Sequence, residues 1–366
     1  MKCYFAPVDH RFSAPTTGDD LDALVALSNA VGADGSLTQP GGGNSSIKRR
    51  ALDFAGREID VLSVKGSGTD LASITRAGFT GLRLDDLALL QRRDEMSDEE
   101  MMAFMRACML DGREPAPSVE TPLHALLPHR CIVHTHDFAT QALTDTPRPE
   151  GLVREVFGDD VAYVDYVRPG FPLARALAKH GALAAPRGLV LARHGLVAWG
   201  DTPRACYDNL HHLINVAEAF VASKGTAKAR AFFAVTAPAS PERRRAAARA
   251  LLPVLRKGVS GARPAILHLD DSPEALAFAG SDAARTLHAR GMVTPEHILR
   301  CGRVPLLVDG AGDLAAAPRA DAARAIEAGL AKYADPTRHS GAFPGLNVIP
   351  CMAERNCFRL RQPITS

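Results

Sequence analysis

Apolar residues recur three and four positions apart in four segments of the first 225 residues, which is the periodicity of an amphipathic helix. One segment opens with Ser97 and Glu100 in the spacing of a capping box. A shorter segment is predicted to be capped by Ser118, and a long one to end at Gly225. The predicted helices cover residues 19–31, 97–110, 118–128 and 202–225.

Short apolar runs between these helices predict strands. The two β-rich halves of residues 187–201 meet at His194, where we expect a turn. A stretch rich in Pro and Ala, residues 235–244, is predicted to be a linker. The sequence therefore predicts a first domain over residues 1–234, followed by a linker and a mixed C-terminal appendage over 235–366. The other predicted strands cover residues 45–50, 59–64, 130–136 and 303–310.

Composition narrows the class of protein. The 366 residues are 46% hydrophobic, so the chain is globular. Its 43 Lys and Arg balance 41 Asp and Glu, and 5% of residues are aromatic, which disfavours a nucleic-acid partner. Seven dispersed cysteines are typical of reduced thiols, and no apolar run approaches the roughly 20 residues that span a bilayer. We expect a cytoplasmic protein with no membrane partner.

Two histidines stand in the predicted strand 130–136, "RCIVHTH", which is otherwise apolar. Alternation along a strand places His134 and His136 on one face, where two imidazoles can hold a metal. His194, at the predicted turn, would complete three nitrogens with an open position, as in catalytic zinc sites. The alternative is chance, because the chain has 13 histidines. His211 and His212 are adjacent on a predicted helix, face different directions and are interpreted as ordinary helix residues.

Glu120 lies at the start of the predicted helix 118–128 and is a candidate acid or base. The simpler interpretation is an acid that complements the helix dipole. Glu120 and His124 are also four residues apart on one helical face, which leaves a rival metal pair open.

Two Gly- and Ser-rich loops, "GGGNSS" and "KGSGTD", present backbone amides and hydroxyls that suit an anion such as phosphate. Neither has the spacing of a phosphate-binding P-loop or of a dinucleotide fingerprint. Most such loops are turns, so each loop alone is a weak indication.

Five motifs in one order resemble the class II aldolase/adducin family: "PGGGNSS", "VKGSGTDLASI", "PSVETPLHALLP", "VHTH" and "ARHGLVAWGD". The resemblance covers roughly residues 20–225. Further stretches, among them "GFTGLRLDDL" and "YVRPGF", are similar to the aldolase half of bifunctional rhamnulose-1-phosphate aldolase/short-chain dehydrogenase proteins. The tail has no glycine fingerprint and no Tyr-x-x-x-Lys pair, so we expect the dehydrogenase half to be absent.

The resemblance implies an α/β fold: a three-layer α/β/α domain with a central, largely antiparallel sheet. It implies zinc as cofactor, held by His134, His136 and His194, and Glu120 as catalytic acid/base. It assigns the phosphate of a sugar-phosphate substrate to four further residues. These are Asn44, Ser67, Gly68 and Ser118. Val119 departs from the small hydroxyl residue that some fuculose-phosphate-type members carry there.

The function that the resemblance implies is that of a zinc-dependent lyase. A ketose 1-phosphate similar to rhamnulose 1-phosphate would be cleaved to dihydroxyacetone phosphate and an aldehyde, in a homotetramer with sites at subunit interfaces. Sugar-phosphate 4-epimerases and decarboxylases of the same fold are an alternative. A non-catalytic, adducin-like binding module is another, which the presence of all three histidines disfavours.

Overall fold

A computed structural model describes the protein in two units, Met1–Lys224 and Gly225–Ser366, which we treat separately. The predicted boundary after residue 234 lies outside the described residues. The predicted linker was wrong at its C-terminal end, because the helix α10 (Pro241–Val259) begins there with Ser240 as its N-cap. The described residues are 12–13, 18–179, 185–225, 240–260, 264–297, 304–309, 324, 326–331, 347–351 and 357–361.

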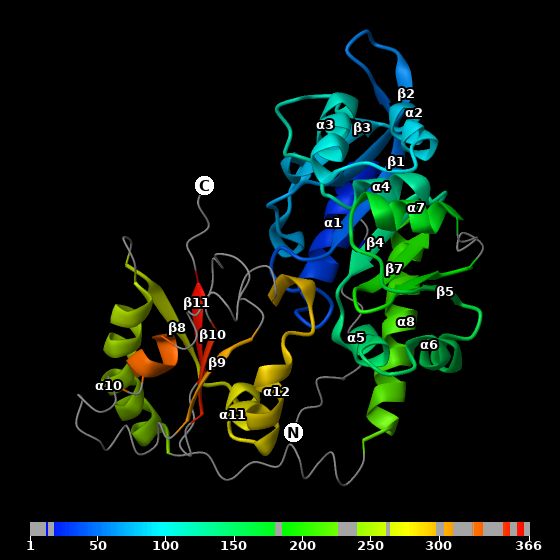
Figure 1. Ribbon diagram of the computed structural model, residues 1–366. Coiled ribbons are helices and arrows are strands. Elements are labelled where there is room, and N and C mark those ends of the chain that lie inside the picture. Colours follow the sequence, from blue (N-terminus) through cyan, green and yellow to red (C-terminus); the bar gives the residue numbers. More distant parts are fainter. Residues whose placement is uncertain are drawn as a thin grey trace. The chain divides into compact units, whose positions relative to one another are not determined.

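The first unit is built on a sheet of seven strands in the order β3-β2-β1-β4-β7-β6-β5 (Figure 1). All neighbouring strands are antiparallel except β5 and β6, which are parallel. The predicted, largely antiparallel sheet is therefore confirmed. The strands are β1 (Asn44–Leu52), β2 (Glu58–Lys65), β3 (Phe79–Arg83), β4 (Cys131–Thr135), β5 (Val161–Val164), β6 (Gly188–Leu191) and β7 (Gly195–Gly200).

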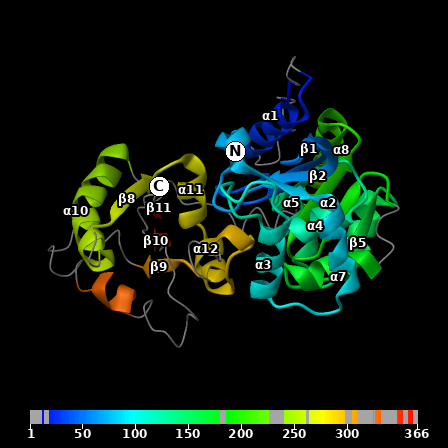
Figure 2. The same cartoon turned by 90° about the horizontal axis from the view of Figure 1, so that it is seen from above.

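Helices cover both faces of this sheet, which confirms the three-layer arrangement. We call the two faces after a helix on each. The α8 face is covered by α1 (Asp20–Gly32), α5 (Phe138–Thr144), α6 (Pro149–Phe157) and α8 (Pro203–Ser223). The α4 face is covered by α2 (Leu84–Ala88), α3 (Asp98–Cys108), α4 (Thr121–Leu126) and α7 (Phe171–Lys179). Figure 2 shows α1 and α8 on one side of β1 and β2, and α2, α3, α4 and α7 on the other. Short 3-10 turns complete the unit: η1 (Leu71–Ser73), η2 (Arg76–Gly78) and η3 (Leu89–Arg92).

The alternation of side chains along β4 assigns each residue to a face. Cys131 and Val133 belong to the core of the α8 face, and Ile132 to the core of the α4 face. His134 therefore points to the α4 face, as does Asn44, its partner in the β1–β4 register. The candidate site residues Asn44 and His134 therefore share this face.

Of the two helix caps predicted at Ser97 and Ser118, the structure confirms the first and contradicts the second. Ser97 and Glu100 form the predicted capping box at the start of α3. The prediction that Ser118 caps the next helix was wrong, since α4 begins at Thr121 with Glu120 as its N-cap. The Ser118 hydroxyl, two residues before the N-cap, instead accepts a hydrogen bond from the Glu120 backbone N–H at 3.2 Å. Glu120 is thereby fixed at the very start of α4.

The second unit has a core of its own, so the predicted C-terminal appendage is a second domain. The helix α10 packs Leu251 and Leu255 against Leu306 and Ile326. A four-stranded sheet has the order β8-β11-β10-β9, and β9 confirms the strand predicted over 303–310. The remaining elements are β8 (Ile266–Asp270), α11 (Pro273–Ala279), α12 (Asp282–Leu287), η5 (His288–Arg290), β9 (Leu306–Asp309), β10 (Asn347–Cys351) and β11 (Cys357–Arg361).

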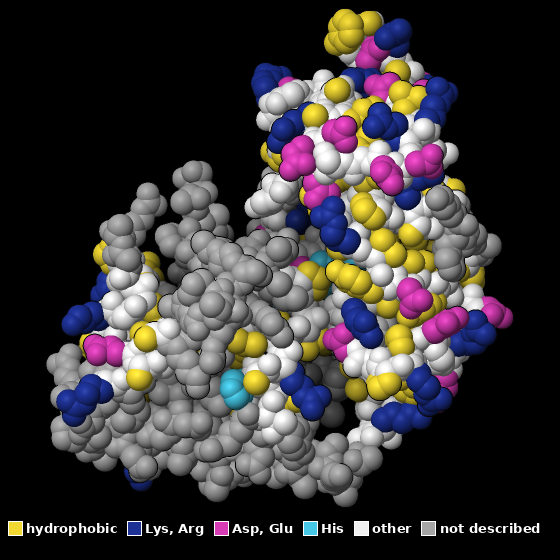
Figure 3. Space-filling view, viewed as in Figure 1, with side chains coloured by type: hydrophobic (Ala, Val, Ile, Leu, Met, Phe, Trp, Pro, Cys, Tyr) yellow, Lys and Arg dark blue, Asp and Glu magenta, His cyan; other side chains and the backbone are white. Residues whose placement is uncertain are grey.

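The surface of the first unit carries both signs of charge. Figure 3 shows Lys and Arg side chains interspersed with Asp and Glu on the face it presents. None of the helices in the described ranges is both long enough and apolar enough to cross a bilayer.

Candidate metal and proton-transfer site

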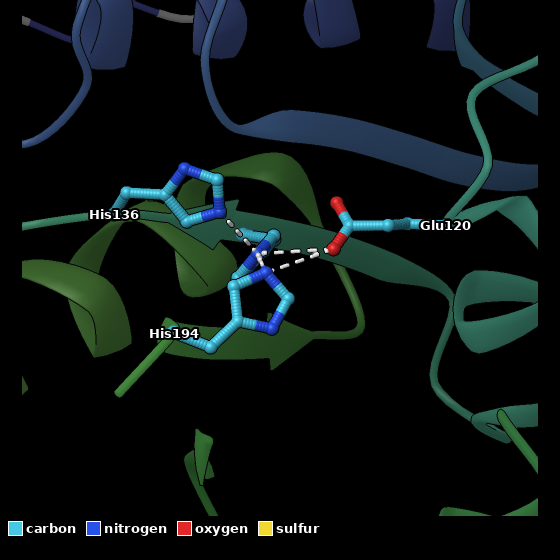
Figure 4. Close-up of side chains that lie close together, drawn as sticks. Glu120, His136 and His194 are labelled. Atoms are coloured by element: carbon cyan, nitrogen blue, oxygen red, sulfur yellow. Dashed lines mark hydrogen bonds and ion pairs between the residues drawn. The ribbon is translucent and has the colours of Figure 1, made fainter. Parts of the chain in front are cut away.

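Four side chains that are far apart in the sequence converge on the α4 face. Glu120, His134, His136 and His194 are all buried, and one donor atom from each lies within 4.8 Å of the others. Figure 4 shows the Glu120 carboxylate pointing toward His194 and His136. The structure therefore brings together the three histidines and the glutamate that the sequence singles out.

The antiparallel pairing of β4 with β7 builds the histidine cluster. His134 lies in β4 and His136 directly follows it, while His194 directly precedes β7. In the register, Thr135 of β4 is paired with Leu196 of β7. The end of one strand is therefore beside the beginning of the other, which explains why His194 meets the other two rings.

The turn before β7 depends on an unusual backbone conformation at Arg193 and on close packing at Gly195. Arg193 has φ 55°, a left-handed conformation that residues other than glycine rarely adopt. A Cβ atom on Gly195 would lie 2.1 Å from the Thr135 carbonyl oxygen and 3.1 Å from ring atoms of both His134 and His136. Only glycine fits at this position, because β7 approaches the end of β4 so closely.

The ring nitrogens are spaced as ligands of one metal ion. The Nε2 atoms of His134 and His136 are 3.0 Å apart, and those of His134 and His194 are 3.3 Å apart. Two ligands of a tetrahedral zinc ion, each about 2.05 Å from the metal, would be about 3.3 Å apart. His134 Nδ1 lies 3.0 Å from the Leu196 carbonyl oxygen, which can only accept, so Nδ1 carries the proton and Nε2 the lone pair. The donor set fits a divalent cation.

The charge states also suit a metal site. Burial lowers the pKa of His134 well below its usual range, which keeps the ring neutral. Burial by itself raises the pKa of Glu120, but the neighbouring imidazoles of His134 and His194 together have the larger, opposite effect, and the net pKa is well below its usual range. Glu120 Oε1 is 3.0 Å from His194 Nε2 and 3.7 Å from His134 Nε2. The carboxylate is thus ionised and in reach of the metal position.

The rival pair of Glu120 and His124 does not form a second cluster. The His124 ring is fully buried, and its Nε2 contacts the side-chain oxygen of Asn44. Its Nδ1 lies 2.7 Å from the Ser46 hydroxyl. Both nitrogens of His124 are therefore engaged by β1 rather than directed at the three histidines.

The structure brings three of the four predicted phosphate residues to adjoining segments. Ser67 and Gly68 follow β2, and the Ser67 N–H donates to the Ala116 carbonyl oxygen at 2.7 Å, two residues before Ser118. Asp70, the last residue of "KGSGTD", links the two Gly-rich loops, because its carboxylate accepts from the Gly41 N–H of "GGGNSS" at 2.8 Å. The fourth residue, Asn44, donates from Nδ2 to Glu120 Oε2 at 2.5 Å.

Sequence analysis missed the contacts around Asn44. A signal was present in two spacings: Asn44 and Ser46 share a strand face, and Glu120 and His124 share a helix face. The spacings could not reveal that α4 packs against β1 on the α4 face of the sheet. That contact joins residues 76 positions apart.

Comparison with known proteins identifies the family. The chain belongs to the class II aldolase/adducin family, since residues 22–221 match the model described as "Class II Aldolase and Adducin N-terminal domain". Residues 246–338 match "Aldolase class II, second domain", which agrees with the separate core of the second unit.

Two relatives are informative. The "Uncharacterized oxidoreductase YuxG" of Bacillus subtilis is 37% identical over 290 residues, which cover 79% of this chain and 42% of that protein. The chain thus spans less than half the length of that relative. The N-terminal class II aldolase domain of a conserved protein from Thermoplasma acidophilum is 38% identical. It covers 58% of this chain and 99% of its own, with a TM-score of 0.54.

Proposed function

We propose that the protein is a zinc-dependent lyase that cleaves a ketose 1-phosphate, similar to rhamnulose 1-phosphate, into dihydroxyacetone phosphate and an aldehyde. The observation that carries the proposal is the buried cluster of three imidazoles and one carboxylate in a chain of this family. His134, His136 and His194 would hold the zinc, because three neutral nitrogens with an open position are typical of catalytic zinc.

The chain's own residues supply the proton chemistry. A zinc ion in this cluster would serve as a Lewis acid for the oxygens of the ketose. Glu120 is ionised and buried beside it, so Glu120 can accept and return the proton at C3 of the three-carbon product. Its fixed place at the start of α4 orients the carboxylate before the substrate arrives.

The phosphate would be held by hydroxyls and backbone groups of the two loops, beside which the Lys65 Nζ donates to the Gly41 carbonyl oxygen at 3.3 Å. Ser67 and Ser118 offer hydroxyls, and Gly68 adopts φ 83°, which exposes backbone in the loop after β2. Asn44 is the fourth proposed contact, because its Nδ2 carries a second N–H besides the one that it donates to Glu120. Remote binding of the phosphate would orient the reacting carbons.

A homotetramer and a cytoplasmic location complete the proposal. Cys108, Cys131 and Cys206 are free and buried, which agrees with a reducing compartment. Light scattering on the purified protein tests the tetramer, since its mass should be close to four chains.

The decisive experiment incubates the zinc-loaded protein with a panel of ketose 1-phosphates and measures dihydroxyacetone phosphate with a coupled assay. We expect its release from at least one ketose. An epimeric sugar phosphate without dihydroxyacetone phosphate would favour a 4-epimerase, and release of carbon dioxide from a sugar acid a decarboxylase. A protein that binds zinc and turns over none of these compounds would favour a binding module.

A further inference from the structure

A chain of buried hydrogen bonds leads from β1 to the carboxylate of Glu120. Ser46 and His124 are fully buried and Asn44 is 3% exposed. The Ser46 hydroxyl lies 2.7 Å from His124 Nδ1, His124 Nε2 contacts Asn44 Oδ1, and Asn44 Nδ2 lies 2.5 Å from Glu120 Oε2. Four side chains from two elements are thereby joined in one line.

The negative end of this line fixes the direction of every hydrogen bond in it. A carboxylate accepts only, so Asn44 must present its N–H to Glu120 and its oxygen to His124. His124 must then donate from Nε2, and as a neutral ring it accepts at Nδ1 from the Ser46 hydroxyl. Burial lowers the pKa of His124 to about 4, which agrees with the neutral tautomer. All three donors therefore point toward Glu120.

This chain of hydrogen bonds gives the two carboxylate oxygens of Glu120 different contacts. Oε1 faces the histidines, at 3.0 Å from His194 Nε2, while Oε2 is held by Asn44. Figure 4 shows one carboxylate oxygen joined to the histidine side and the other turned away. Without Asn44, the carboxylate could rotate about its last bond and exchange the two oxygens.

We propose that Asn44, His124 and Ser46 form a positioning relay that fixes the Glu120 carboxylate with Oε1 toward the reacting carbon. This inference rests on the proposed role of Glu120, and it makes Asn44 and His124 positioning residues rather than catalytic ones. The relay adds a task to Asn44 beyond the phosphate contact proposed for it.

The test measures exchange of the C3 proton of dihydroxyacetone phosphate with deuterated water, in zinc-loaded protein without any aldehyde. His124→Leu, which removes the donor to Asn44, should slow this exchange by about tenfold to a hundredfold with zinc content unchanged. His124→Gln keeps a side-chain N–H and should recover most of the rate. Equal rates in the Leu and Gln variants would overturn the relay.

Neighbouring serines of β1 provide a matched control for changes in stability. Ser45 and Ser46 are both fully buried and hydrogen-bonded, but Ser45 contacts Ser28 of α1 on the α8 face at 2.7 Å. Ser46→Ala should reduce the exchange rate severalfold, while Ser45→Ala should leave it unchanged at a similar loss of thermal stability. Equal effects of the two changes would show that only general packing matters.

A phosphate-free ketose separates the two tasks of Asn44. If Asn44 positions Glu120, Asn44→Ala lowers kcat for the phosphorylated and the phosphate-free ketose alike. A rise in KM confined to the phosphorylated ketose would leave only the phosphate contact and would overturn the relay.

A readout without substrate uses protein with isotope-labelled histidine. The relay requires a slowly exchanging Nε2–H on His124, and Glu120→Gln should shift its resonance. An Nδ1–H tautomer would contradict the relay directly. Failure of the proposed function is distinguishable, because the wild-type protein would then exchange no C3 proton, or Glu120→Gln would exchange it as fast as the wild type, whatever the state of His124.

Discussion

Two buried glutamates on opposite faces of the same sheet have pKa values shifted in opposite directions. Glu120 at the start of α4 is 7% exposed, and Glu218 of α8 is 5% exposed. Burial raises the pKa of Glu218 to about 7, and the carboxylates of Asp34 and Asp137 add to the increase. The pKa of Glu120 is well below its usual range, because imidazoles and not carboxylates surround it. Burial alone therefore does not determine the charge of an acid; its neighbours do.

The difference between the two pKa values indicates different roles for the two faces of the sheet. The α8 face packs aliphatic side chains of four helices around a glutamate that is easily protonated near neutral pH. The α4 face places three potential metal ligands beside a glutamate that stays ionised. An ionised carboxylate is the form that can remove a proton, so we place the chemistry on the α4 face.

Removal of a histidine from the cluster should have the largest effect. We expect about one zinc per chain in the wild-type protein and almost none in His134→Ala, measured by elemental analysis. His124→Ala is the matched control on the same face, and it should keep its zinc because His124 contacts β1 instead. Undiminished zinc in His134→Ala would mean that the metal lies elsewhere.

Replacement of the ionised glutamate should have the next largest effect. Glu120→Gln keeps the size of the side chain but cannot accept a proton, so kcat should fall on the order of a hundredfold or more. Zinc content and the thermal unfolding temperature should stay close to the wild-type values. Unchanged exchange of the C3 proton of dihydroxyacetone phosphate in this variant would return Glu120 to the role of an ordinary helix-start acid.

Glu218 should make the stability of the protein depend on pH in the opposite sense to an ordinary acid. Its pKa is raised from 4.5 to about 7, so the folded state retains the proton. The associated stability is complete below pH 4.5 and is lost as the pH rises through 7. The glutamine of Glu218→Gln cannot ionise. The free energy of unfolding of this variant should therefore exceed that of the wild type by on the order of 2–3 kcal/mol at pH 8.

Urea unfolding of both proteins at pH 5 and at pH 8 checks this prediction. The two free energies of unfolding should be similar at pH 5 and diverge at pH 8. A constant difference at both values would show that Glu218 ionises normally and that the contrast with Glu120 is smaller than we infer.

The smallest effect is expected in the phosphate loops. Ser67→Ala removes one hydroxyl and should raise KM severalfold with little change in kcat, if the contact is equally strong in the ground and transition states. A ketose without phosphate serves as the control, because the variant and the wild type should cleave it equally well. A wild type that cleaves the two substrates with equal efficiency would argue against phosphate binding by these loops.

Local rules predicted individual helices and strands better than they predicted the site, and the fold itself was implied by the family resemblance. Alternation along β4 correctly placed His134 and His136 on one face, and the capping box at Ser97 formed as expected. The predicted turn at His194 made it a candidate third ligand, and the family resemblance singled it out, since spacing within "VHTH" cannot reveal a partner 60 residues away. The predicted cap at Ser118 was wrong because the Ser118 hydroxyl bonds to the Glu120 N–H, just before the first residue of the helix.

Long-range packing explains the rest of what the sequence could not reveal. The Asn44–Glu120 hydrogen bond needs β1 and α4 in contact, and no local pattern encodes that distance. The need for glycine at position 195 likewise arises only after β7 has paired with β4. Both features are products of the assembled sheet.

The pairing of β4 with β7 also fixes when a metal can be captured during folding. His134 and His136 are close together even in the unfolded chain, because they are two residues apart. His194 reaches them only after a loop of about 60 residues has closed. An ion would therefore bind the native state in strong preference to the unfolded chain. Such selective binding adds RT ln(1 + [L]/Kd) to the free energy of unfolding. A chelator should then lower the melting temperature of the first unit without any change in its sequence.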